Sequence, residues 1–517
     1  MAGKLFSLTA PCFLLSKLLP KRSHQYVSSA TNSKFQKLNS LLHNTSPDFS
    51  NKTLVFHLET ALLKSSSLFP YFMLVAFEAG GLLRALVLFF LYPLLCLVGR
   101  NQALKIMVFV SFVGVRKDKF RIGSSVLPKY FLEDVGNESF SLVMSGKRKV
   151  AVSDMPRIMV EGFLKHYLGV DAVRGRELKV VSGYFVGLMA ANNVNGVVLD
   201  DDKMVSDQAV GIGCFSKYSL DHQLFSYCKE IYLVSEADKW NWQILPREKY
   251  PKPLIFHDGR LAFRPTPLAS RIMFMWLPLG IFIFIIRYIG STILPIQISH
   301  AVNSSTGAKT TISKPKESIT KNDTKTGGVL YICNHRTLLD PIFVSYSVMK
   351  PVPAVTYSIS RFSEVSSPIK IVRLTRDREK DKKLIEQQLC QGDLVVCPEG
   401  TTCREPYLLR FSPLFAEMTD EIVPIAIDIQ VNMFYGSTAS RIKCLDPVFN
   451  LLNPFIQCSV KILGKIPSSQ TCKAGGKPRI EVANHVQKEI AKALGFESTI
   501  LTRKDKYKIL AGNEGKV

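Results

Sequence analysis

Apolar residues in the second half of the chain fall into short runs separated by polar and turn-forming residues. These runs cover 329–333, 353–357, 370–374, 394–397 and 422–429. Stretches with helical character lie at 377–391 and 482–494. Short apolar runs bounded by turn residues are typical of buried strands, and their alternation with helices predicts a layered α/β domain.

Two much longer apolar segments, 68–98 and 272–298, need a different explanation. The first is interrupted by Glu78 and Arg84, and the second by Arg287. Their uncharged cores, 85–98 and 272–286, are only 14 and 15 residues long, fewer than the roughly 18 to 20 residues that a membrane-spanning helix needs. Prolines at positions 93, 278 and 295 predict kinks. Two tilted spans, two re-entrant or interfacial hairpins and a core of a soluble protein all stay open, and membrane contact is our prediction.

Composition and charge agree with contact with a membrane or with anionic substrates. The chain has 517 residues, 47% of them hydrophobic, and a net charge of +24. This length predicts about two to four domains. The basic residues are spread along the chain and no nucleic-acid-binding module is recognisable, so an anionic lipid surface or phosphorylated and CoA substrates explain the charge better. Eleven scattered cysteines without a CxxC pair indicate reduced thiols rather than disulfides or a zinc site.

The two ends of the chain and one internal stretch predict the remaining boundaries. Residues 1–47 contain no Asp or Glu and six Lys or Arg, which is typical of a mitochondrial transit peptide or of a disordered or membrane-surface segment. Residues 301–327 are rich in Ser, Thr and Lys and predict a linker. The expected division is an extension 1–47, a first domain 48–265 containing apolar segment 68–98, a second apolar segment 266–300, the linker 301–327, a second domain 328–500 and a basic tail 501–517.

A histidine and an aspartate follow the run 329–333. His335 comes almost directly after it, and Asp340 lies five residues later, ahead of a proline. If a helix begins just after His335, Asp340 lies one turn along and can bond one imidazole nitrogen. That contact fixes one tautomer and leaves the other nitrogen to take a proton from a hydroxyl. The pair therefore predicts a general base, provided that neighbouring motifs supply a substrate site.

The neighbouring motifs favour a phosphate. The run 395–397 ends in a turn that carries Glu399, Gly400, Thr401 and Arg404. Backbone N–H groups and a guanidinium in such a turn can bind a phosphate. Arginines at positions 373, 376 and 378 lie between the two motifs, the last at the start of a charged helix where a solvated surface role is expected. Cys397 and Cys403 are interpreted as ordinary thiols, because no acyl-enzyme is required.

In order and spacing, four blocks resemble the glycerophospholipid acyltransferase family. They are Asn334–Asp340, Val372–Arg378, Pro398–Thr401 and Ile422–Ile427. The resemblance implies His335 as the base, Asp340 as its orienting partner, and a substrate site formed by Arg373, Arg376, Glu399, Gly400, Thr401 and Arg404. It implies acyl-CoA as co-substrate and neither a cofactor nor a metal. Family members usually place an arginine directly after the sequence Pro-Glu-Gly-Thr (PEGT), which is 398–401 here. In this chain Thr402 and Cys403 stand between that sequence and Arg404, which leaves the identity of the phosphate ligand open.

The first half resembles haloacid-dehalogenase-like phosphatases in a degenerate form. His57 and Glu59 stand where that family has its nucleophilic and acid–base aspartates, and the run 149–153 ends in the serine of a second motif. Cys214 replaces the first aspartate of the metal pair, so that only Asp221 remains. The family's motif lysine cannot be placed. A histidine does not ligate Mg²⁺ as a carboxylate does, and without that charge phosphoryl transfer loses its stabilisation.

Together, the two halves resemble the land-plant glycerol-3-phosphate acyltransferases that acylate the sn-2 position. The resemblance implies release of lysophosphatidic acid, for glycerolipid or extracellular lipid polyester synthesis, at a membrane that is the endoplasmic reticulum or, as an alternative, the mitochondrion. Expected partners are acyl-CoA, glycerol 3-phosphate and membrane lipid, and no nucleic acid. A lysophospholipid acyltransferase and a non-catalytic membrane scaffold remain alternatives. The presence of His335, Asp340, Glu399 and Arg404 argues against the scaffold.

Overall fold

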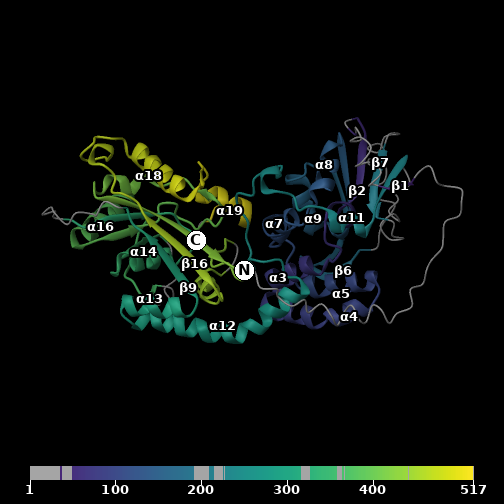
Figure 1. Cartoon of the computed structure of the whole chain (residues 1–517), viewed down its shortest axis with the longest axis horizontal. Helices are drawn as coiled ribbons and strands as arrows, with labels where there is room; N and C mark the ends of the chain where they lie inside the picture. The colour runs from purple at the N-terminus through teal and green to yellow at the C-terminus, as the bar shows by residue number, and fades with distance from the viewer. Residues whose placement is uncertain are drawn as a thin grey trace, which may run out of the picture.

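The computed structural model describes residues 35–37, 49, 51–190, 209–214, 225, 228–315, 327–357, 364–365, 367–439 and 442–515. Within them, two α/β domains lie side by side, each built on its own sheet (Figure 1). Helix α12 (Pro267–Ile293) runs beneath both domains along one side of the molecule. The α/β class predicted for the second half is confirmed, and the first half, which resembles haloacid-dehalogenase-like phosphatases, is also α/β.

The first domain contains a six-stranded parallel sheet. Its order is β1 (Phe35–Lys37), β8 (Glu230–Val234), β7 (Ala209–Cys214), β2 (Thr53–His57), β3 (Arg148–Pro156) and β4 (Ala172–Arg176). Strands β7, β2 and β3, which are adjacent, carry Cys214, His57 and Ser153, and β3 contains the run 149–153. Strand β2 is buried along its whole length because neighbouring strands and helices cover it, which is why its sequence is almost continuously apolar. Short strands β5 (Leu178–Val181) and β6 (Tyr184–Met189) pair with each other.

Helices fill the connections of the first domain. They are α3 (Phe69–Phe90), α4 (Tyr92–Leu97), α5 (Arg100–Phe112), α6 (Ile122–Ser125), α7 (Leu127–Leu132), α8 (Asn137–Ser145), α9 (Arg157–His166) and α11 (Glu236–Asn241). Helix α3 is kinked at Gly81, whose φ of 73° suits glycine. Before the kink α3 belongs to the core, whereas Leu83 and Phe90 beyond it are 74% and 70% exposed. The apolar segment 68–98 is therefore partly core and partly an exposed apolar surface.

The second domain contains a seven-stranded sheet. Its order is β12 (Ile371–Arg373), β11 (Ala354–Thr356), β13 (Leu394–Val396), β10 (Leu330–Cys333), β15 (Ile422–Val431), β16 (Ile456–Ile462) and β9 (Ala308–Ser313). All neighbours are parallel except β15 and β16. The five predicted runs are confirmed as strands β10 to β13 and β15. The two helices predicted here are confirmed as α16 (Arg378–Gln391) and α18 (Arg479–Leu494), and α14 (Asp340–Val348), α17 (Asp446–Leu451) and the two-stranded pair β14 (Tyr407–Leu408) and β17 (Glu497–Ser498) complete the domain.

Two predicted boundaries are wrong. Residues 301–327 were expected to form a linker, but they include the end of α13 (Ile296–Ser305) and all of β9, which pairs with β16. Strand β9 is polar because it lies at the sheet edge, and residues 316–326 are outside the described part. The expected tail 501–517 includes α19 (Arg503–Ala511), which begins with a capping box between Thr502 and Asp505 and buries Tyr507 and Leu510.

Two candidate membrane spans, α3 and α12, are long and apolar enough to cross a bilayer. Helix α12, however, is bonded lengthwise to the second domain. The buried Arg287 donates to the carbonyl oxygens of Leu451 and Asn453, both at 2.7 Å, and Trp276 Nε1 donates to the Leu452 carbonyl at 2.8 Å. The charge that interrupts this apolar run is thus satisfied inside the protein. The outer face of α12 exposes apolar residues, among them Ile272, Met275, Phe282 and Ile293.

The segment 256–262 joins the two domains. Tyr435 N–H donates to the Arg260 carbonyl at 2.7 Å, and Ala262 N–H donates to the Met433 carbonyl at 3.0 Å. The Arg260 guanidinium forms a buried ion pair with Asp446 at 2.7 Å, while the backbone N–H of Arg260 donates to Glu78 of α3 at 2.6 Å. These contacts connect both domains through one short stretch of chain.

Candidate active site

His335 and Asp340 are in direct contact at the carboxyl end of β10. His335 Nδ1 lies 2.9 Å from Asp340 Oδ2. The expectation of a helix starting just after His335 is wrong, because α14 begins only at Asp340. Asp340 is instead brought to the imidazole by the loop 334–339.

The Asp340 carboxylate is fixed by the same loop. It is fully buried and accepts hydrogen bonds from the backbone N–H groups of Arg336 at 2.6 Å and Thr337 at 2.9 Å, and from the Thr337 hydroxyl at 2.9 Å. With the carboxylate held in place, His335 keeps its proton on Nδ1 when the ring is neutral. Nε2 is then the nitrogen that can accept a proton from a substrate hydroxyl.

Burial lowers the pKa of His335, but its charged and polar neighbours raise the pKa by more, so it lies above the ordinary 6.5. The neighbours are the Cys397 thiol and Asp340. A hydrogen bond with Cys333, whose Sγ lies 3.4 Å away, and burial hold the pKa of Cys397 well above its usual value, so that this thiol is uncharged near neutral pH. The Asp340 carboxylate is therefore the charge that raises the pKa of His335.

Glu399 holds the backbone of His335. Its Oε1 accepts the His335 N–H at 2.7 Å and its Oε2 accepts the Leu409 N–H at 3.0 Å. The side chain is buried, and burial raises its pKa to about 7. Because both oxygens are engaged by backbone, Glu399 is placed as a support of the base. This position differs from the expectation that Glu399 belongs to the substrate site.

The turn that follows Glu399 is attached to His335 a second time. Gly400 has a φ of 66°, which glycine adopts without strain. Thr401 and Thr402 are buried, and the Cys403 N–H donates to the His335 carbonyl at 2.6 Å. We refer to residues 398–404 as the PEGT turn. Sequence reasoning missed Lys506 of α19, whose Nζ donates to the Thr402 carbonyl.

Arg404 does not face an open phosphate site. Its Nε and Nη2 donate to the His257 carbonyl at 3.2 and 3.0 Å, its Nη1 donates to the Gly259 carbonyl at 2.9 Å, and Nη2 lies 3.6 Å from Asp258. The guanidinium also stacks 4.1 Å from the Tyr435 ring. These contacts occupy nearly all of the five N–H donors. Arg404 therefore binds the PEGT turn to the interdomain segment 256–262.

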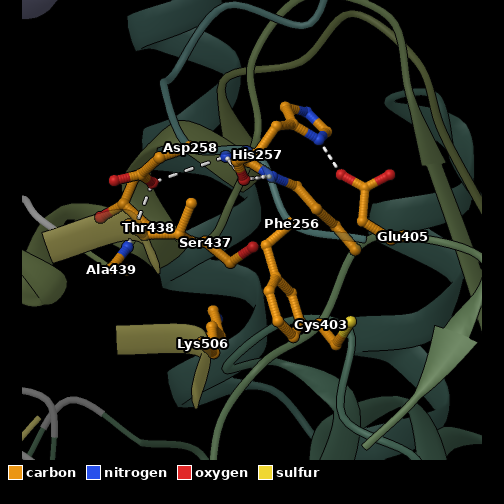
Figure 2. A pocket seen from close by; sticks show the side chains of 11 residues that line it. Phe256, His257, Asp258, Cys403, Glu405, Ser437, Thr438, Ala439 and Lys506 are labelled. Carbon is orange, nitrogen blue, oxygen red and sulfur yellow. Dashed lines mark hydrogen bonds and ion pairs between the residues drawn. The ribbon is translucent and has the colours of Figure 1, made fainter. Parts of the chain in front are cut away.

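The surroundings of Arg404 leave no room for a substrate. The cavity bordered by Phe256, Asp258, Cys403 and Lys506 in Figure 2 has a volume of about 10 Å³, enough for a single water. His257 forms a buried contact with Glu405 there, and burial holds the pKa of His257 well below its ordinary value.

The other three arginines lie at or just after the carboxyl end of strand β12, and His335 follows the carboxyl end of β10 in the same sheet. Arg373 ends β12 and pairs with Glu364, its Nε lying 2.7 Å from Oε2. Arg376 is exposed and has a φ of 71°, and the described residues record no hydrogen bond or ion pair for its guanidinium. Arg378 forms a two-contact pair with Glu417, as expected for a surface residue. Strands β12 and β10 are three positions apart in the sheet, about 14 Å.

A large apolar cavity opens beside the His335–Asp340 loop. It has a volume of about 470 Å³ and lies between α12, α13, α14 and β9. Leu338 and Leu339 of the loop and Pro341 of α14 line it, together with Phe284 and Tyr288 of α12. Its size is that of typical ligand pockets. The cavity can take an apolar chain alongside the loop that carries the base.

In the first domain, the residues at the phosphatase-motif positions form a network of hydrogen bonds and ion pairs with one another. His57 Nδ1 lies 3.2 Å from Glu59 Oε2, and His57 Nε2 lies 3.8 Å from Asp154. Glu59 Oε1 accepts hydrogen bonds from the Ser153 hydroxyl at 2.5 Å and from the Asp154 N–H at 3.0 Å. Burial lowers the pKa of His57, yet Glu59 and Asp154 raise it by more, which favours the imidazolium. The His57 imidazole thus stands between the Glu59 and Asp154 carboxylates.

A buried lysine that sequence reasoning could not place completes this network. Lys239 of α11 donates to the Glu59 carbonyl at 2.9 Å. Cys214 ends β7 next to these groups in the sheet, and Asp221 is outside the described residues. Among the residues that the structure describes, no three His, Cys, Asp or Glu side chains form a group that could hold a metal ion.

Comparison with known proteins finds the two halves in two families. The family described as "Glycerol-3-phosphate acyltransferase RAM2-like, HAD-like domain" matches residues 53–234, and the family described as "Acyltransferase" matches residues 314–428. The chain is 50% identical to "Probable glycerol-3-phosphate acyltransferase 2" of Arabidopsis thaliana, covering 100% of this chain and 99% of that protein. It is 51% identical to "Probable glycerol-3-phosphate acyltransferase 3" of the same plant, covering 91% and 92%. Identity to "Glycerol-3-phosphate acyltransferase RAM2" of Petunia hybrida is 41%, covering 89% and 97%.

Proposed function

This chain belongs to the plant glycerol-3-phosphate acyltransferases, and on that premise we propose that it transfers an acyl group from acyl-CoA to the sn-2 hydroxyl of glycerol 3-phosphate. The products are lysophosphatidic acid and free coenzyme A. The observation that carries the proposal is the contact of His335 with a buried, backbone-held Asp340, in a loop whose Leu338 and Leu339 line an apolar cavity.

In the proposed reaction, His335 acts as the general base. Nε2 removes the proton of the glycerol hydroxyl as its oxygen attacks the thioester carbon, and the imidazolium that forms is stabilised by Asp340. The bond from carbon to sulfur then breaks, and the thiolate of coenzyme A takes a proton. No covalent acyl-enzyme and no metal is needed. Acyl-CoA enters as a co-substrate, not as a cofactor.

The 470 Å³ cavity supports the assignment of an acyl donor. Its walls are largely apolar, and it reaches the loop that carries His335. An acyl chain lying there buries apolar surface at about 25 cal/mol per Å². Because α12 forms one wall of the cavity and exposes apolar residues on its outer face, the chain can pass between the cavity and a lipid phase.

For the phosphate of glycerol 3-phosphate, we propose Arg376 as the principal ligand and Arg373 as a second one. Arg376 is exposed on the edge of the sheet that carries His335. Arg373 first has to exchange its pairing with Glu364. Arg404 is not included, because the interdomain segment occupies its donors. Gly400 and Thr401 act by shaping the PEGT turn.

We also propose that the first domain has no phosphatase activity. His57 replaces the nucleophilic carboxylate and already pairs with Glu59. The His57 ring lies between the Glu59 and Asp154 carboxylates, which are thereby engaged by the protein, and phosphoryl transfer without a divalent cation lacks its main stabilisation. Lysophosphatidic acid, rather than monoacylglycerol, is therefore the expected product.

The decisive experiment is to identify the product formed by membranes that contain this protein, supplied with acyl-CoA and glycerol 3-phosphate. Mass spectrometry under conditions that suppress acyl migration separates 2-acyl lysophosphatidic acid from monoacylglycerol. Monoacylglycerol contradicts the inactive first domain. Acylation of a lysophospholipid but not of glycerol 3-phosphate contradicts the acceptor, and no acylation of either contradicts the enzyme assignment in favour of a scaffold.

We propose the endoplasmic reticulum membrane as the location, with the acid-free sequence 1–47 keeping the mitochondrion as the alternative. Fluorescent tagging at the C-terminus with markers of both organelles separates the two. A mitochondrial signal that disappears when residues 1–47 are deleted would overturn the proposed location.

A further inference from the structure

Lys506 is a buried lysine with no part in the proposed chemistry. It lies in α19 and is 6% exposed, although transfer of an ammonium out of water is costly unless other acceptors replace the water. Its Nζ donates to the Thr402 carbonyl and lies 3.4 Å from the hydroxyl oxygens of both Thr401 and Thr402. These three acceptors match the three N–H donors of an ammonium group.

All three acceptors belong to the PEGT turn, between its two attachments to His335. On one side of them, Glu399 accepts the His335 N–H at 2.7 Å. On the other side, the Cys403 N–H donates to the His335 carbonyl at 2.6 Å. A change at Lys506 therefore reaches the backbone of the base from both directions.

The turn also has other supports, and from the C-terminal helix Tyr507 packs against Cys403 beside Lys506. Arg336 Nη1 donates to the carbonyl oxygens of Cys403 and Glu405, at 3.1 and 2.7 Å, and Arg404 binds the interdomain segment. Figure 2 shows Lys506 beside Phe256 and Cys403, among the residues that line the small cavity there. Since the adjoining cavity measures only about 10 Å³, Lys506 has no room to bind a substrate phosphate there.

The docking of α19 does not depend on the ammonium group alone. Tyr507 and Leu510 pack with Phe256, Cys403 and Leu409 in one apolar cluster, and the Thr502–Asp505 capping box starts the helix. Loss of the charge is thus expected to leave α19 in place while releasing the turn.

We propose that Lys506 is a positioning residue of the acyltransferase site, which fixes the PEGT turn and thereby the orientation of His335. The inference deepens the proposed function and rests on it for the kinetic part of its test. A general base displaced by about 1 Å loses on the order of 100-fold in rate, because the proton and the attacking oxygen no longer align.

The kinetic test compares Lys506→Met with Lys508→Met, which changes an exposed lysine of the same helix. We expect Lys506→Met to lower kcat about 100-fold with KM for both substrates within about twofold, and Lys508→Met to match the wild type. Wild-type kcat in a folded Lys506→Met protein overturns the inference. So does a raised KM for glycerol 3-phosphate at unchanged kcat, which would make Lys506 a substrate ligand.

A second measurement does not require turnover. Diethyl pyrocarbonate modifies neutral imidazoles. Peptide mass spectrometry gives the rate of modification of His335, and the exposed His166 serves as an internal reference. We expect a rate at least threefold higher at His335 in Lys506→Met and no change at His166. Equal rates at His335 overturn the inference even if the wild type fails to acylate glycerol 3-phosphate, whereas that failure by itself contradicts only the proposed function.

If Lys506→Met does not accumulate as a folded protein, the test uses variants of Thr402, which faces the Lys506 ammonium group. Thr402→Val removes one hydroxyl that faces Nζ, and Thr402→Ser keeps it. We expect about a fivefold fall in kcat for the valine variant and wild-type behaviour for the serine variant. Equal kcat values for the two variants overturn the inference.

Discussion

The backbone N–H of His335 donates to Glu399, 64 residues later in the chain, at 2.7 Å. A side chain of the PEGT turn thus supports the base through its main chain, while Asp340 orients its ring. The two motifs are therefore parts of one structure, in which the first carries the proton transfer and the second fixes its geometry.

His335→Ala is expected to remove more than about 95% of the acyltransferase turnover, because general base catalysis contributes roughly 100- to 10,000-fold. Expression and membrane association should be unchanged, because the side chain is not part of either domain core. The assay is acyl transfer to glycerol 3-phosphate, with His166→Ala on the exposed surface of the first domain as the control. Retention of more than a few per cent of activity would show that another group takes the proton.

The pH dependence of kcat should follow the raised pKa of His335. A general base works when deprotonated, so activity falls as the pH drops through that pKa, and the acidic limb should have a midpoint above 6.5. Asp340→Asn removes the carboxylate that raises the pKa and should move the limb to lower pH while reducing kcat. A wild-type midpoint at or below 6.5 would contradict the assignment.

Glu399→Gln should lower kcat about 10- to 100-fold with little change in KM. A glutamine offers one acceptor oxygen where two backbone N–H groups need one each, so either His335 or Leu409 faces an NH₂ group. Steady-state kinetics with glycerol 3-phosphate varied provide the measurement, and the exposed Glu497→Gln is the matched control. A higher KM with unchanged kcat would mean that Glu399 binds substrate directly.

Arg376→Met and Arg404→Met should fail in different ways. Loss of Arg376 should raise KM for glycerol 3-phosphate by about tenfold or more without lowering the melting temperature, since its guanidinium is exposed. Loss of Arg404 leaves the buried carbonyl groups of His257 and Gly259 without donors and should lower the melting temperature by several degrees. If Arg404→Met instead raised KM for glycerol 3-phosphate and Arg376→Met lowered the melting temperature, Arg404 would be a ligand of the substrate.

His57→Asp is not expected to produce a phosphatase. The variant restores one carboxylate, but Cys214 still stands where the metal pair begins. Release of inorganic phosphate from lysophosphatidic acid with Mg²⁺ present is the measurement, and catalytically intact wild-type protein is the reference. Phosphate release above that of the wild type would show that a metal site persists.

Sequence reasoning was successful where the pattern is local. The strands that end at Cys333 and Val396 follow from short apolar runs, and they bring the two motifs together because β10 and β13 pair in parallel. It failed for Arg404, since nothing in the local pattern shows that segment 256–262 lies against it. Lys506 was missed for the same reason: a lysine in a basic tail gives no sign that a turn 104 residues away will bury it.

The buried Arg287 has a consequence for how the chain is made. Its carbonyl partners at Leu451 and Asn453 are translated 164 and 166 residues after it, on the order of ten seconds later at typical rates of synthesis. Until then, the Arg287 guanidinium of this apolar helix lacks most of its final hydrogen-bond acceptors. Helix α12 reaches its final packing only when these parts of the second domain have folded against it. Ribosomes that stall between residues 293 and 451 therefore leave a nascent chain in which α12 is complete but Arg287 lacks these two partners.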